Sequence, residues 1–196
     1  MSIPPTGVSD PHILAGMRRW LERAVIGLNL CPFAKSVHVR GQVHWVVSHA
    51  ASSRALEDEL LHELRSLVAT DPAERDTTML VVPQGLDDFF EFNRFLADTT
   101  RLLKRHALAG VLQIASFHPE FQFAGTSPDD VTNCSNRAPY PTLHLLREAS
   151  IDRAVRSFPD AESIYGNNIR TLEQLGLAGW RRLGAGRSDR DDGDGR

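Results

Sequence analysis

Hydrophobic residues recur at the spacing of an α-helix in three long stretches of the chain, residues 10–29, 53–70 and 87–108. Asp10 can cap the first stretch with Pro11 at its first helical position, a combination common at helix starts. Two shorter helices are predicted near the C-terminus. The first, at residues 151–158, follows the capping residue Ser150, and the second, at residues 168–175, ends before Gly176.

Short apolar and β-branched stretches lie between these helices and predict strands. Three of them are residues 43–48, 77–82 and 111–117, and a short extended piece is expected just before them at residues 37–39. Residues 142–147 fit a fourth strand, and a helix fits them nearly as well. The order strand, helix, strand, helix, strand implies right-handed crossovers between parallel strands.

The pattern predicts an α/β fold. We expect a two-layer or three-layer sandwich with a mainly parallel sheet of three to four strands, helices packed on it, and a long functional loop after the third strand. The length of 196 residues and the 41 % hydrophobic content suit one core. Residues 10–183 are expected to form this single domain, with a flexible arm at 1–9 and a disordered tail at 184–196.

Composition excludes several classes of partner and leaves others open. The net charge of −3 argues against general nucleic-acid binding, which needs a clustered basic surface. No apolar run reaches the roughly 18 residues that span a bilayer, so we expect no membrane insertion and a soluble cytoplasmic protein. Cys31 and Cys134 are the two cysteines, too few for a disulfide framework. The oligomeric state stays open.

Residues 117–148 form the stretch where a functional site is expected. They combine two histidines, several acids, asparagines, arginines and prolines, and their middle predicts neither helix nor strand. Ligands of open α/β sheets bind beyond the carboxyl ends of the parallel strands, and this loop leaves the third strand there with His118. If the fourth strand is antiparallel, Asn136 and Arg137 overhang the same crevice.

One interpretation is a nucleophilic or acid–base site. Cys31 would be the thiol, His118 or His144 its base, and an acidic residue such as Asp130, Asp129 or Glu120 would orient the imidazole. A reactive thiolate near neutral pH requires an adjacent imidazole or a helix N-terminus. The structural alternative is that Cys31 is a small buried residue beneath the first helix.

A second interpretation is anion recognition. Arg137 would bind a carboxylate or phosphate, and Asn133 and Asn136 would be its neutral partners. Arg147 is a further candidate for binding the anion. The structural alternative is that these side chains bind the carbonyl groups of the loop itself. The chain contains neither the glycine- and lysine-containing phosphate loop nor the G-x-G-x-x-G dinucleotide-binding motif after a strand.

A third interpretation is a metal site with His118, Glu120 and His144 as ligands, to which Asp129 and Asp130 could contribute. Zinc or iron would accept such ligands, but the spacing matches no established ligand pattern. As structural alternatives, His118 is a strand-end imidazole bonded to a nearby carbonyl, and Asp130 is a helix cap or turn residue.

Five motifs give the chain a family resemblance that covers about residues 20–176. It resembles a bacterial family known only as a domain of unknown function, on the segments LNLCPFA (28–34), QIASFHP (113–119), FQF (121–123), NRAPYP (136–141) and LHLLRE (143–148). The resemblance implies no reaction and no cofactor, so both stay unknown. Because the motifs include Cys31, His118, Asn136, Arg137 and His144, it favours a shared site.

The leading hypothesis is a small cytoplasmic enzyme, of hydrolase or transferase type, that acts on an anionic small molecule. Arg137 and Asn136 would bind the anion, and His118 and His144 would perform acid–base chemistry. The first alternative is a non-catalytic ligand-sensing or partner-binding module that uses the same crevice. The second alternative is a metal-dependent enzyme with His118, Glu120 and His144 as ligands.

Overall fold

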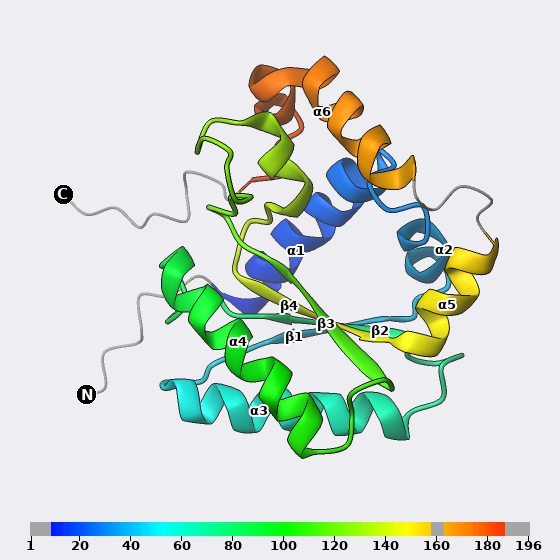
Figure 1. Ribbon diagram of the computed structural model, residues 1–196. Coiled ribbons are helices and arrows are strands. Elements are labelled where there is room, and N and C mark those ends of the chain that lie inside the picture. Colours follow the sequence, from blue (N-terminus) through cyan, green and yellow to red (C-terminus); the bar gives the residue numbers. More distant parts are fainter. Residues whose placement is uncertain (1–8, 158–162, 187–196) are drawn as a thin grey trace.

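A four-stranded sheet lies at the centre of the protein, which we describe from a computed structural model over residues 9–157 and 163–186 (Figure 1). The strand order is β1-β2-β4-β3, and the strands are β1 Val43–Val47, β2 Thr77–Val81, β3 Leu112–Phe117 and β4 Thr142–Arg147. β1 and β2 are parallel, and β4 is antiparallel to both β2 and β3. Residues 142–147 therefore form a strand, and the carboxyl ends of β1, β2 and β3 share one edge with the start of β4.

Helices cover both faces of the sheet, which confirms the α/β class and gives three layers (Figure 1). α3 (Ser53–Ala69) and α4 (Phe89–Arg105) pack on one face, where Leu80 and Leu143 belong to the core. α1 (Asp10–Trp20) and the following π-helix η1 (Leu21–Ile26) pack on the opposite face. Successive residues of each strand point to opposite faces, so Met79 and Val81 meet α1 while Leu80 meets α3 and α4.

The connection between η1 and β1 differs from the expectation. Residues 37–39, predicted to be extended, belong to a short helix, α2 (Ala34–Val39). The backbone N–H of Ala34 donates to the carbonyl of Cys31 (3.2 Å), which starts a turn directly after Pro32. None of the residues of α2 is buried, so the alternation of Val37 and Val39 did not reflect a strand face.

Helix boundaries near the C-terminus also differ. α5 (Glu148–Ser157) follows β4 directly and begins before Ser150, and the Phe158 end of the predicted helix lies outside the described residues. α6 (Ser163–Arg182) begins five residues before the predicted start at 168. Gly176 does interrupt α6 with a positive φ of 64°, but the helix resumes after it.

The third predicted helix ends earlier than its sequence pattern indicated. α4 begins after Asp88, whose carboxylate accepts the backbone N–H groups of Phe90 and Glu91. It ends at Arg105, and Ala107 takes a positive φ of 56°. Gly110, which follows the predicted helix, lies in the turn before β3 with a φ of 80°.

The first residues of the predicted tail, 184–186, lie within the described part of the chain. The carbonyl of Gly184 accepts a hydrogen bond from Arg19 Nε (3.1 Å), and Ala185 is only 1 % exposed. The start of the predicted tail therefore packs against α1. Residues 1–8 and 187–196 lie outside the described residues. Within the described part of the chain, no helix is long and apolar enough to cross a membrane.

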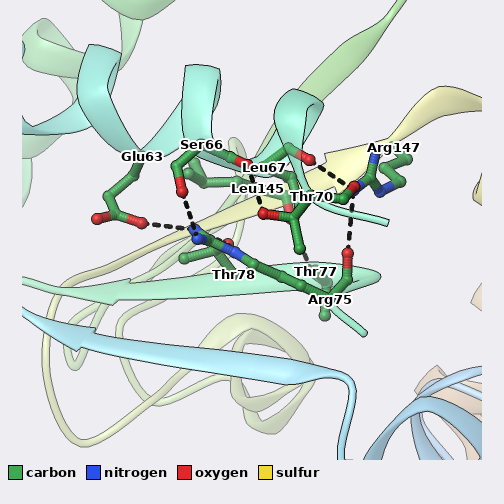
Figure 2. Close-up of polar contacts among 9 residues, drawn as sticks. All are labelled: Glu63, Ser66, Leu67, Thr70, Arg75, Thr77, Thr78, Leu145 and Arg147. Carbon is green, nitrogen blue, oxygen red and sulfur yellow. Dashed lines mark hydrogen bonds and ion pairs between the residues drawn. The ribbon is translucent and has the colours of Figure 1, made fainter. Parts of the chain in front are cut away.

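A buried ion pair lies where α3 meets the start of β2 (Figure 2). Arg75 binds the carboxylate of Glu63, and both residues are 8 % exposed. The same guanidinium donates to the hydroxyls of Ser66 (2.9 Å) and Thr78 (2.8 Å). These bonds compensate for the desolvation of the two charges and fix α3 against β2.

Replacing Arg75 with alanine is expected to lower the free energy of unfolding by about 3–5 kcal/mol, because it leaves the Glu63 carboxylate buried without its partner. Arg65 is exposed on α3, the helix that carries Glu63, so Arg65→Ala should change the free energy of unfolding by less than about 0.5 kcal/mol. Chemical denaturation of both variants checks this. An Arg75→Ala variant as stable as Arg65→Ala would contradict a supporting role for the pair.

Candidate functional site

A cavity of about 300 Å³ opens between the Leu30–Cys31 turn, the end of β3, the long loop and α6. The loop contains a short 3₁₀ helix, η2 (Val131–Asn136), on which α6 packs (Figure 1). The cavity combines residues from five separate parts of the chain: Val25, Leu30, Cys31, Phe117, Phe123, Thr132, Ser135, Asn136, Tyr165, Asn168, Ile169 and Leu172.

Each wall of this cavity is held by contacts to another segment. Asn168 Nδ2 on α6 donates to the carbonyl of Leu30 (2.9 Å), so α6 fixes the turn that carries Cys31. Leu30 and Leu172 are buried together in a small cluster with Cys134 of η2. The wall at the end of β3 is fixed by an edge-on ring contact, with 5.0 Å between the ring centroids of Phe117 and Trp20.

Cys31 lies at this cavity and is partly exposed. Burial raises the pKa of its thiol above the ordinary value of 9.0, and this effect outweighs hydrogen bonds from the backbone N–H groups of Phe33 and Ala34. The described lining residues include no histidine. The thiol is therefore protonated near neutral pH and lacks the adjacent imidazole that the nucleophile hypothesis requires.

His118 lies on the other side of the loop and is fully buried. Its ring sits beside Phe89 and Phe92 of α4, with ring-centroid distances of 5.2 and 5.0 Å. The backbone N–H of Glu120 donates to Nδ1 (3.0 Å), so Nδ1 carries no proton and Nε2–H donates to the carbonyl of Leu86 (3.0 Å). Burial lowers the pKa of this imidazole, and both ring nitrogens are occupied.

His144 is in the middle of the sheet, opposite Met79 on β2 and Ala115 on β3. The hydroxyl of Thr77 donates to the carbonyl of Leu145 (2.7 Å), so it accepts the Nε2–H of His144 (2.6 Å). Burial lowers the pKa of His144 to about 4. The side chain is therefore neutral over the physiological range and binds a neighbouring strand.

Asn133 and Arg137 bind the long loop to itself. Asn133 is fully buried, and its Oδ1 accepts from the backbone N–H of Phe123 (2.9 Å) while its Nδ2 donates to the carbonyl of Ser127 (2.9 Å). Arg137 donates to the carbonyls of Phe121 (3.1 Å) and Pro128 (2.7 Å). This geometry matches the structural alternative, in which these side chains bind the loop's own carbonyl groups.

Asp130 and Arg147 also have structural partners. Asp130 is the N-cap of η2, and hydrogen bonds from Thr132 lower the pKa of its carboxyl group. The guanidinium of Arg147 donates to the carbonyls of Leu67, Thr70 and Arg75, which ties the end of α3 to β4 (Figure 2). Arg147 therefore lies at the opposite edge of the sheet from the long loop.

Asn136 reaches the cavity together with Cys31. Its Oδ1 accepts the hydroxyl of Ser135 (3.0 Å), and its carbonyl accepts the backbone N–H of His118 (3.2 Å). The structure records no partner for its Nδ2 among the described residues. Of the residues predicted as catalytic or ligand-binding, Cys31 and Asn136 are the two that line this cavity.

The structure does not gather the three predicted metal ligands, His118, Glu120 and His144, into one group. The ring of His118 packs against Phe92 of α4, and His144 binds Thr77 within the sheet. Of the three predicted ligands, Glu120 is the one that is exposed. Across residues 9–157 and 163–186, no group of three or more His, Cys, Asp and Glu side chains could hold a metal ion.

Several residues that line this cavity were not predicted from the sequence. Thr132, Ser135, Tyr165 and Asn168 carry no motif of a binding site, and Asn168 comes from a helix that was expected to start at that position. The two asparagines of the lining, Asn136 and Asn168, are 32 positions apart in the sequence, and the packing of α6 on η2 brings them to the same cavity.

Comparison with known proteins adds a family to this geometry. The model of a family described as "Protein of unknown function (DUF1415)" matches residues 12–182. The chain belongs to this family. No curated protein and no solved structure gives a match. Four of the five segments on which the family resemblance was based contribute to the cavity, through Cys31, Phe117, Phe123 and Asn136.

Alkylation of the thiols tests the environment of Cys31. Because burial raises the pKa of Cys31, iodoacetamide at pH 7.5 should label it more slowly than it labels glutathione, and labelling should accelerate as the pH rises toward the ordinary thiol pKa and beyond. Mass spectrometry separates Cys31 from Cys134, which is 1 % exposed and should react more slowly still. Labelling of Cys31 faster than glutathione at pH 7.5 would restore the nucleophile hypothesis.

Proposed function

We propose that this protein binds a small uncharged molecule in the cavity between the Leu30–Cys31 turn, η2 and α6, and that it acts as a non-catalytic ligand-binding module. One observation carries the proposal: none of the described residues that line the cavity is a lysine, arginine, histidine, aspartate or glutamate. A charged ligand would lose its hydration there without gaining a counter-charge.

The balance of apolar and polar lining residues supports a metabolite-sized ligand. Most of the wall is hydrophobic or aromatic, and a few polar groups converge on it, as in small-molecule sites generally. The volume of about 300 Å³ lies at the lower end of the range for such sites. The ligand is therefore small, with an apolar body.

Two amide side chains define its polar groups. Asn168 uses its Nδ2 to hold Leu30, so its Oδ1 is the end that can accept a hydrogen bond from a ligand. Asn136 uses its Oδ1 to accept from Ser135, so its Nδ2 is the end that can donate. A ligand with one donor and one acceptor, such as an alcohol or an amide, satisfies both.

The hydrogen-bonding pattern favours binding over catalysis. The Cys31 thiol has no base beside it, and the imidazoles of His118 and His144 are engaged with Leu86, Glu120 and Thr77. An enzyme of the hydrolase or transferase type would need at least one such group free to move a proton. The net charge of −3 agrees with a small-molecule partner rather than nucleic acid, and we keep the cytoplasm as the proposed location.

A thermal-shift screen with uncharged and anionic metabolites tests the proposal. The expected result is that stabilising compounds are uncharged and that Ile169→Trp, which fills the cavity, abolishes their effect. Ile151→Trp is the matched control, because Ile151 is a similarly half-buried isoleucine of α5 that does not line the cavity.

Two outcomes would contradict the proposal. If Ile169→Trp leaves the stabilisation by each compound unchanged, the ligand binds elsewhere. If a stabilising compound is chemically converted by the wild-type protein and this conversion is lost in Cys31→Ser, the protein is an enzyme and Cys31 takes part in its reaction.

A further inference from the structure

A second cavity of about 380 Å³ lies between α2 and α5, which run side by side in Figure 1. It shares no lining residue with the cavity described above. Its walls come mainly from one face of each helix. The lining residues are Pro32, Phe33, Ser36, Val37, Arg40, Asp76, Ser150, Arg153, Ala154 and Ser157.

The spacing of these residues shows that two helix faces oppose each other across the groove. On α2 and its ends the lining positions are 33, 36, 37 and 40, and on α5 they are 150, 153, 154 and 157. Both sets follow the i, i+3, i+4, i+7 pattern of a single helical stripe. Each stripe carries one arginine and at least one serine, so both walls offer hydrogen-bond donors.

Arg40 is the cation on the α2 side. Its Nε donates to Oε1 of Gln42 (2.6 Å), and its Nη1 donates to the hydroxyl of Ser36. The structure records no partner for its Nη2 among the described residues. These two contacts hold the guanidinium over the groove and leave donor capacity for a ligand.

Arg153 is the cation on the α5 side. Its Nη2 donates to the hydroxyl of Ser150 (3.0 Å), and that hydroxyl donates to the carboxylate of Asp76 (2.6 Å). Asp76 is the one acidic residue of the lining, and it also attracts the neighbouring guanidinium of Arg147. The groove therefore keeps an excess of positive charge.

We propose that the groove between α2 and α5 binds the phosphate group of a small phosphate ester. A planar carboxylate can be satisfied by one guanidinium, whereas a phosphate has three terminal oxygens and can be bound from both walls at once. Pro32, Phe33, Val37 and Ala154 provide an apolar floor for the organic part of the ester. This proposed site includes none of the residues of the anion site expected at Arg137.

Titration calorimetry with inorganic phosphate tests this site, against sodium chloride at matched ionic strength. We expect saturable binding by the wild-type protein and about tenfold or greater weakening in Arg40→Gln and in Arg153→Gln, since each variant removes a charge-assisted hydrogen bond. Arg156→Gln is the matched control, because Arg156 is exposed on the same helix, carries the same charge and does not line the groove. It should bind phosphate like the wild type.

Arg153→Lys separates arginine geometry from charge and should bind phosphate with intermediate affinity. Arg153 is exposed, so Arg153→Gln should keep the melting temperature of the free protein and remain decisive even if Arg40→Gln unfolds. No saturable binding by the wild type, or equal weakening in Arg153→Gln and Arg156→Gln, would overturn the proposal.

The source of the phosphate is distinguished by sedimentation with phosphatidylcholine vesicles that contain or lack phosphatidic acid. Binding to the phosphatidic acid vesicles that is lost in Arg153→Gln would support the site with a lipid headgroup as its ligand. Calorimetric phosphate binding without vesicle binding would support a soluble phosphate ester.

Discussion

A chain segment without helix or strand can pack against a core only if its own peptide groups find hydrogen-bond partners. Between β3 and β4 some of those partners are other backbone groups of the loop, and side chains supply several more. Asn133 binds the backbone at Phe123 and Ser127, and Arg137 binds two further carbonyls of the same loop. His118 fixes the loop to the chain before α4 through Leu86. The density of polar residues in this stretch therefore follows from burying an irregular backbone, and the rest of the candidate site depends on it.

The fixed loop provides one wall of the first cavity, and α6 provides the opposite one. Arg137 contributes through its backbone as well, because its carbonyl accepts the indole N–H of Trp20 (2.8 Å), and Trp20 in turn contacts Phe117 at the cavity wall. The same residues that looked suited to chemistry thus position the surface that can bind a ligand. In this arrangement the protein's polar side chains shape the cavity, and its apolar side chains and two asparagines would contact the ligand.

The spacing of hydrophobic residues predicts most of the helices and strands, because buried positions recur with the period of each element. The apolar stretches at 77–82 and 111–117 contain β2 and β3, and the helix predicted at 53–70 is α3. Periodicity fails at α2, where Val37 and Val39 alternate without a buried face. Residue type alone also could not separate a catalytic His118 from one whose two nitrogens are occupied. The Glu63–Arg75 pair and the opposition of Arg40 and Arg153 depend on tertiary packing that no local pattern encodes.

The most direct test of this account is nitrogen NMR of the His118 imidazole as a function of pH. A structural histidine held by Leu86 and Glu120 should keep its proton on Nε2 and its lone pair on Nδ1, and burial should keep its pKa below the ordinary 6.5. We therefore predict a single tautomer that remains neutral as the pH falls through 6.5. An imidazole that exchanges between tautomers and titrates at or above pH 6.5 would contradict the structural role of His118 and restore it as a candidate acid–base group.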